Sequence, residues 1–242
     1  MTVPCGPRDL VERLGPHPTT LLAIDLSSDE GVDRWWIVAC LLSHRCDEHR
    51  ALETYRSLAR AGLGTPTAIA GSDGVELESV LTKSGLPRPD RAARTLARGS
   101  AALTRHSNAS LKSIADEAES GDDLANRLSR VASGIGAATV TAFLRPLRDH
   151  WGLAQEIPLA PAARAAALHL GLLREGEDEE GEPGALRAFL LQQADSPALS
   201  DVEAALTRLG RRSCLRGREG RCPLGSDCPA RAQATVPASM SS

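Results

Sequence analysis

Apolar residues recur at helical spacing along most of the chain. The spacing Ser27-x-x-Glu30 is typical of a capping box, and it leads into the strongly apolar segment 35–42, which predicts a helix at the centre of a core. Further helices are predicted over 8–14, 47–63, 91–105, 162–173, 185–193 and 201–209. No segment alternates apolar and polar residues for long enough to predict a strand, so we expect an all-α fold.

A turn at residues 133–139 lies between two segments of helical apolar spacing, 124–132 and 140–147. In this turn Gly134-Ile135-Gly136 places two glycines around one apolar residue, which is typical of a helix-hairpin-helix. The amides that open the second helix of such a hairpin can contact a phosphate without reading base sequence. The candidate positions are Gly134, Ile135, Gly136, Ala137 and Thr139. A plain turn with a glycine cap is the alternative reading of these residues alone.

Charge is distributed unevenly along the chain. The net charge of -3 is unusual for a DNA-binding protein, so a nucleic-acid role has to depend on local basic segments. Residues 175–184 are mostly acidic and predict a solvated loop, whereas arginines crowd into 208–221, where Glu219 is the one acidic residue. We expect the arginines of this segment to contact DNA phosphates. Besides Arg208, they are Arg211, Arg212, Arg216, Arg218 and Arg221. Aromatic residues make up 2% of the chain, which argues against a stacking platform for single strands.

Length and hydropathy limit the class of protein. With 242 residues the chain can form one large or two small domains. No apolar run reaches the roughly 18 residues that a membrane span needs, and the N-terminal segment lacks the apolar centre of a signal peptide. We therefore expect a cytoplasmic protein, monomeric and without a membrane partner, whose small polar residues 229–242 form a disordered tail.

From Trp35 to Cys228 the order of features resembles the helix-hairpin-helix DNA glycosylases of the endonuclease III family. The passages that carry the resemblance are Thr65-Pro-Thr-Ala-Ile-Ala with Val80-Leu-Thr-Lys-Ser-Gly-Leu86, then 128–139, then Ser213-Cys-Leu215 with Gly220-Arg-Cys-Pro-Leu224 and Cys228-Pro229. The resemblance implies a two-lobed fold, with a six-helix barrel over 28–145 and a second helical domain built from 1–27 and 146–228. It also implies that duplex DNA lies between the lobes, with a base flipped into a pocket there.

Two catalytic positions of the family hold alanine in this chain. The lysine that attacks the sugar in lyase members corresponds to Ala138. The aspartate that stabilises charge on the sugar corresponds to Ala160, counted back from the segment His169-Leu-Gly-Leu172. A methyl group does neither job, so we expect little or no lysine-dependent lyase activity at abasic sites.

Other side chains are weaker candidates for these roles. Asp149 follows the hairpin and Glu156 precedes the next helix, although each is more simply a surface carboxylate. The chain's two lysines, Lys83 and Lys112, lie outside the hairpin. Where the family places a glutamine that fills the gap left by the flipped base, this chain offers His44 and Arg45. We therefore expect Arg45 to contact DNA.

The C-terminal cysteines have a changed spacing. The family holds a four-iron four-sulfur cluster on four cysteines in this region, whereas this chain has Cys214, Cys222 and Cys228, with Glu219 near the place of the missing one. Asp227 or Cys5 are candidates for a fourth ligand. The alternative is a loop that has lost the cluster. Of the other cysteines, Cys40 is expected in the core, and Cys46 has no assigned role.

These observations favour one function and leave two alternatives. The leading expectation is a DNA-binding protein of the base-excision-repair type that binds duplex DNA at a lesion or abasic site through the hairpin. The first alternative is a monofunctional DNA glycosylase that activates water with another carboxylate, such as Asp149. The second is a structural protein whose hairpin contacts a protein partner.

Overall fold

The computed structural model describes residues 5–229 except 45, 106–109, 132–134, 175, 177–180 and 194. The described residues form helices joined by short connections and contain no strand, which confirms the all-α prediction. None of the described helices is both long and apolar enough to cross a membrane. The predicted tail lies, apart from Pro229, outside the described residues.

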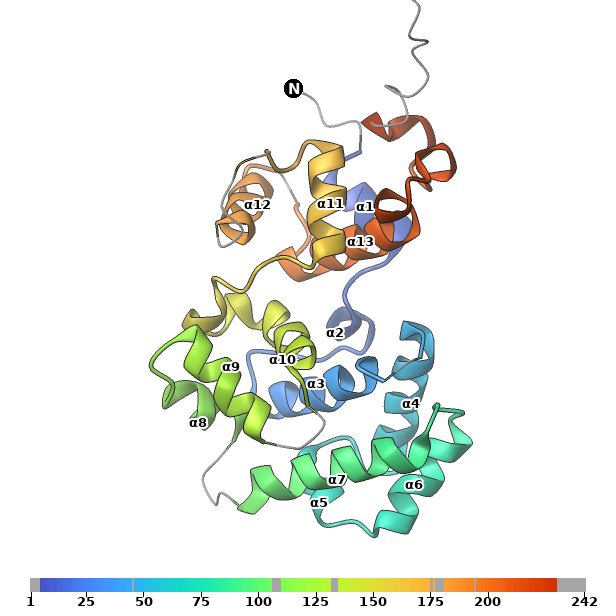
Figure 1. Ribbon diagram of the computed structural model, residues 1–242, viewed down its shortest axis with the longest axis vertical. Coiled ribbons are helices and arrows are strands. Elements are labelled where there is room, and N and C mark those ends of the chain that lie inside the picture. The colour runs from blue at the N-terminus through green and yellow to red at the C-terminus, as the bar shows by residue number, and fades with distance from the viewer. Residues whose placement is uncertain are drawn as a thin grey trace, which may run out of the picture. The chain divides into compact units, whose positions relative to one another are not determined.

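The chain divides into two compact units. The central unit comprises residues 21–155, and the terminal unit comprises residues 1–20 together with 156–242 (Figure 1). The terminal unit therefore draws on both ends of the chain. The central unit spans more residues than the predicted barrel 28–145, because residues after 145 pack against the hairpin helices. For example, the rings of Phe143 and Trp151 meet edge to face with centroids 5.8 Å apart.

The central unit is organised around helix α3 (Asp29–Leu42). Its side chains Trp35, Trp36 and Ile37 are almost completely buried, as the apolar segment predicted. The helix contacts five others in this unit, which are α4 (Glu48–Arg60), α5 (Pro66–Ala70), α7 (Pro89–Arg105), α8 (Leu111–Asp116) and α10 (Ala137–Leu144). The remaining elements are α6 (Gly74–Lys83), α9 (Gly121–Arg130) and the 3-10 turns η1 (Arg145–Asp149) and η2 (Gly152–Ala154).

The start of α3 differs from the predicted capping box by one residue. Ser28 is the N-cap, and its hydroxyl accepts a hydrogen bond from the amide of Gly31 at 3.1 Å. Ser27 is occupied elsewhere, since its hydroxyl donates to the carboxylate of Asp25 at 2.7 Å. The chain approaches Gly31 so closely that a Cβ there would lie 1.7 Å from the carbonyl oxygen of Asp25. Glycine is therefore required at this position.

The terminal unit has four α-helices and three short 3-10 turns among its described residues. The α-helices are α1 (Pro7–Leu14), α11 (Pro161–Leu170), α12 (Glu182–Leu191) and α13 (Leu199–Arg212). The turns η3 (Cys214–Arg216), η4 (Glu219–Arg221) and η5 (Gly225–Asp227) follow α13, while α2 (Pro18–Leu21) lies where the chain passes into the central unit. Helices α11 and α13 cross at Gly210, where a Cβ would lie 1.9 Å from the carbonyl oxygen of Ala162.

The acidic segment 175–184 is not a loop throughout. Helix α12 already begins at Glu182, whose side chain is only 1% exposed. The guanidinium Nε of Arg164 on α11 donates to its carboxylate at 2.6 Å. The other oxygen of this carboxylate, Oε2, is buried without a hydrogen-bond partner among the described residues, so Arg164 compensates only part of the cost of burying the charge. Glu182 nevertheless belongs to the packed part of the unit.

Candidate nucleic-acid interface

The hairpin turn lies between α9 and α10 in the central unit, and these two helices contact each other. Gly134 lies outside the described residues. Ile135 is 7% exposed, so the apolar residue of the motif is anchored in the interior. Gly136 is the N-cap of α10, and its carbonyl accepts hydrogen bonds from the amides of Thr139 (2.9 Å) and Val140 (3.2 Å). Thr139 is buried, whereas Gly136, Ala137 and Ala138 are exposed.

The N-terminus of α10 lacks the side-chain cap that other helices of this unit have. Side chains accept a hydrogen bond from a first-turn amide at the N-caps Ser28, Asp47, Thr65, Asp73, Ser110 and Ser120. Gly136 offers no such acceptor, and the first turn of α10 has no acidic residue. A Cβ built on Gly136 meets no atom of the described residues within 4 Å, so among these residues nothing fills the space beside this N-cap. Uncapped amides at an open helix N-terminus form a site suited to an anion.

Buried aromatic side chains hold α10 in place. The indole Nε1 of Trp35 donates to the carbonyl oxygen of Phe143 at 2.9 Å. The rings of Trp36 and Phe143 meet edge to face with centroids 5.0 Å apart. The open N-terminus is thus presented by a helix that packs directly on the central helix α3.

Arg130 is an exposed cation beside the hairpin that the sequence analysis did not identify. It occupies the last turn of α9, just before the turn residues. Its neighbour Arg127 is instead tied to Asp123, whose carboxylate accepts from its Nε at 2.8 Å. The proximity of Arg130 to the glycines along the chain could have revealed it, but the concentration of arginines at 208–221 is the more conspicuous signal.

The two alanines that the resemblance assigns to catalytic positions have different environments. Ala138 is exposed on the first turn of α10. Ala160 is 7% exposed at the N-cap of α11, and its amide donates to the carboxylate of Glu203 on α13 at 2.9 Å. Glu203 is itself 4% exposed, and it orders the start of α11. The two carboxylates proposed as substitutes, Asp149 and Glu156, are both exposed.

The lysines are not part of the hairpin. Lys112 lies 4.0 Å from the carboxylate of Asp29, and Lys83 is exposed in the last turn of α6. Arg45 lies outside the described residues. His44 is half-buried, and burial lowers its pKa, with Arg91 contributing in the same direction.

The six arginines of the segment 208–221 fall into two groups. Arg208 is committed to the fold, because its guanidinium donates to the carbonyl oxygens of Leu14 (3.3 Å), Gly15 and Pro16 (2.9 Å). The prediction that Arg208 contacts DNA phosphates is therefore not retained, because its guanidinium is occupied within the fold. The other five are exposed, and no ion pair of theirs occurs within the described part of the chain. They are Arg211, Arg212, Arg216, Arg218 and Arg221, and the 59% exposed Leu215 lies among them.

The cysteines near the C-terminus lie in an apolar core. Cys5, Cys222 and Cys228 are each at most 6% exposed and belong to the same cluster, against which Cys214 packs. Burial raises the pKa of the Cys5 and Cys222 thiols, and the neighbouring Cys228 raises that of Cys222 further. Asp227 pairs with Arg13 at 2.9 Å.

These thiols are packed among apolar side chains, and a thiol is a poor metal ligand until it loses its proton. Among the described residues, no three His, Cys, Asp or Glu side chains are grouped so as to hold a metal ion. We derive no chemistry from a metal cluster at these cysteines. The iron–sulfur cluster stays a prediction from the resemblance.

Comparisons with protein-family models, with curated proteins and with solved structures give no match to this chain.

Proposed function

We propose that this protein binds duplex DNA at a lesion or abasic site, as a base-excision-repair type of DNA-binding protein without lysine-dependent lyase activity. The observation that carries the proposal is the N-terminus of α10. It is exposed, lacks a side-chain cap and has open space before Gly136, in contrast to six capped helices of the same unit. A backbone phosphate matches such a site in charge and in hydrogen-bonding capacity.

The exposed arginines support the proposal independently. Arg130 lies beside the hairpin, and five exposed arginines follow in the segment 211–221 of the terminal unit. Within the described part of the chain these guanidinium groups form no ion pair, so they can contact phosphates without breaking one there. They would supply the affinity for the DNA backbone that the chain's net charge of -3 does not.

The chemistry that we propose is binding without cleavage of the strand. Ala138 presents a methyl group where lyase members of the resembled family have an amine, so no Schiff base with the sugar can form at this position. The neighbouring exposed residues Gly136 and Ala137 offer backbone amides but no side chain that ionises.

Two measurements on the same oligonucleotides test this proposal. Fluorescence anisotropy with a duplex that carries a tetrahydrofuran abasic analogue is expected to show saturable binding at low salt, tighter than to the intact duplex. Borohydride treatment of the protein with a true abasic duplex is expected to give no covalent adduct. An adduct that disappears on replacement of Lys83 or Lys112 would refute the absence of lyase chemistry. Equal and negligible binding of both duplexes would refute the DNA-binding proposal.

A further inference from the structure

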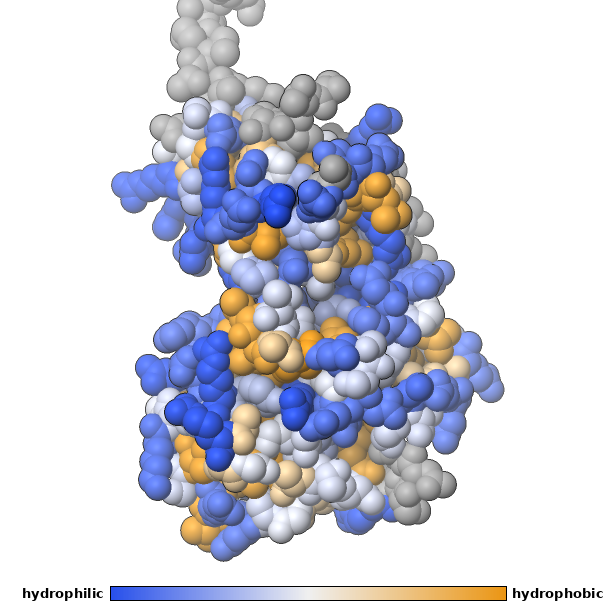
Figure 2. Space-filling view, turned by 180° about the vertical axis from the view of Figure 1, so that it is seen from behind, coloured by the Kyte–Doolittle hydropathy of each residue, from blue (hydrophilic) through white to orange (hydrophobic). Residues whose placement is uncertain are grey.

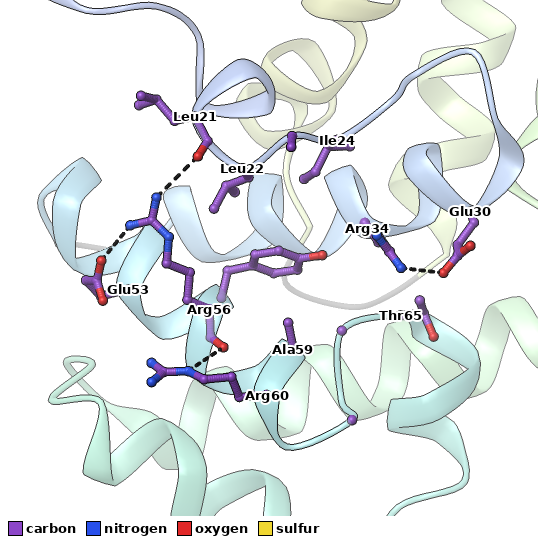
Figure 3. Close-up of a pocket in the computed structure, with 14 residues that line it drawn as sticks. Leu21, Leu22, Ile24, Glu30, Arg34, Glu53, Arg56, Ala59, Arg60 and Thr65 are labelled. Carbon is purple, nitrogen blue, oxygen red and sulfur yellow. Dashed lines mark hydrogen bonds and ion pairs between the residues drawn. The ribbon is translucent and has the colours of Figure 1, made fainter.

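The central unit has a recess whose lining residues include none from α9, α10 or the turn between them. It has a volume of about 820 Å³ and is lined by the connection 21–24, the first half of α3, one face of α4 and the segment 62–65 (Figure 3). Its size falls in the range of pockets that hold small organic ligands. The DNA-binding proposal makes no use of this recess.

The recess combines an apolar inner side with a charged rim. Ile24 and Tyr55 are buried among its lining residues, while Leu21 remains 42% exposed and Ala59 is also exposed. On the face of the molecule that Figure 2 shows, apolar patches lie beside hydrophilic surface. An exposed leucine beside an apolar recess gives a ligand apolar surface to cover.

Three guanidinium groups and two carboxylates lie around the opening. Arg34 pairs with Glu30 at 2.6 Å, and Arg56 pairs with Glu53 at 2.5 Å, each within one helix and each exposed to water (Figure 3). Arg56 also donates to the carbonyl oxygen of Leu21 at 3.3 Å. Exposed pairs of this kind are weak, so the two arginines can turn N–H groups toward an anion while keeping their glutamates.

Arg60 gives the rim its excess positive charge. Its Nε donates to the carbonyl oxygen of Arg56 at 3.2 Å and its Nη2 to the hydroxyl of Ser57 at 3.4 Å. Within the described residues it forms no ion pair. The rim therefore carries one more guanidinium than carboxylate, which favours a ligand with negative charge.

The connection that forms one side of the recess has an unusual backbone. Ala23 has a φ of 51°, in the left-handed region that residues with a Cβ rarely adopt. Such strain persists only where surrounding structure enforces it, and it is concentrated at functional sites. Here the hydrogen bond from Arg56 to Leu21 ties the strained segment to the charged rim.

We infer that this recess binds a small organic anion that joins one phosphate-like or sulfonate group to a flat apolar body. The anionic group would contact Arg34, Arg56 and Arg60, and the apolar body would cover Leu21 and Leu22. This inference does not depend on the proposed DNA binding.

The dye 8-anilinonaphthalene-1-sulfonate matches this chemistry and reports binding by its fluorescence. Titration into the folded protein is expected to show one saturable site. Arg60→Gln is expected to weaken binding about fivefold or more, since one charge-assisted contact is lost. Ala59→Phe is expected to abolish binding by filling the recess from an exposed position, without changing the melting temperature.

Arg105→Gln is the matched control. Arg105 is exposed, occupies the last turn of α7 and donates from Nε to the carbonyl four residues earlier, as Arg60 does in α4. It does not line the recess, so its replacement is expected to leave dye affinity unchanged. Equal weakening by Arg105→Gln, or full binding by both Arg60→Gln and Ala59→Phe, would overturn the inference. So would displacement of the dye by duplex DNA at concentrations that saturate DNA binding, because the arginines would then belong to the DNA interface.

Discussion

Replacement of Gly136 by alanine separates the binding role of the hairpin from its structural role. Gly136 has φ of -98° and ψ of 169°, an extended conformation that alanine adopts without strain. A Cβ at this position meets no atom within 4 Å, so the variant is expected to keep the fold. The added methyl group would project into the open space before α10, where the phosphate is proposed to bind.

The two effects of this substitution differ in size. Glycine to alanine at an N-cap costs about 0.5–1 kcal/mol of stability, which corresponds to a fall of about 1–4 °C in melting temperature for a chain of this size. Loss of one charge-assisted hydrogen bond to the phosphate costs about 1.5–3 kcal/mol, or roughly tenfold or more in DNA affinity. We therefore expect Gly136→Ala to be almost as stable as the wild type but to bind DNA much more weakly.

The assay pairs thermal unfolding with anisotropy titration of the abasic-analogue duplex. Gly74→Ala serves as the control, because Gly74 opens α6 and a Cβ there also meets nothing within 4 Å. Wild-type affinity in Gly136→Ala would refute the assignment of the phosphate to α10. Equal weakening in Gly74→Ala would show that the effect is not specific to the hairpin.

Three further predictions concern the terminal unit. Gly210→Ala is expected to destabilise the terminal unit by about 3 kcal/mol or more, because the new Cβ would overlap the carbonyl of Ala162. A wild-type free energy of unfolding in denaturant titrations would contradict the close crossing of α11 and α13. His17, whose pKa is lowered to about 3 by burial and by Arg208, titrates near 6.5 when unfolded. Stability should therefore fall as pH drops from 6.5 toward 3, by at most about 1.4 kcal/mol per pH unit, and His17→Gln should reduce this slope in urea titrations at pH 7 and pH 5. The double variant Arg216→Gln with Arg218→Gln should reduce the salt slope of DNA binding by about 1.8, and an unchanged slope would remove both arginines from the interface.

Local signals in the sequence predict some helix starts well. The helix predicted over 47–63 is α4, and the side chain of Asp47 caps its N-terminus. Such signals need only the chemistry of a few neighbouring residues. The helix predicted over 91–105 begins two residues earlier, since α7 starts at Pro89. Asp90 therefore lies inside the helix, where it pairs with Arg94 at 2.7 Å.

Long-range contacts account for what the sequence did not predict. Arg208 appeared to be one more basic residue of a cluster, yet its partners are carbonyls about 190 residues away along the chain. Glu182 appeared to end a solvated run, yet Arg164 holds it in the interior. The recess beside Leu21 and Arg60 arises where a connection without periodicity meets α3 and α4, so no sequence pattern indicated it.

The salt dependence of duplex binding by the wild-type protein tests the central claim most directly. The logarithm of the association constant is expected to fall linearly with the logarithm of KCl concentration, with a slope of roughly -4 to -5 if about five arginines contact phosphates. A slope near zero, or no measurable binding at low salt, would contradict the claim that this protein binds the DNA backbone.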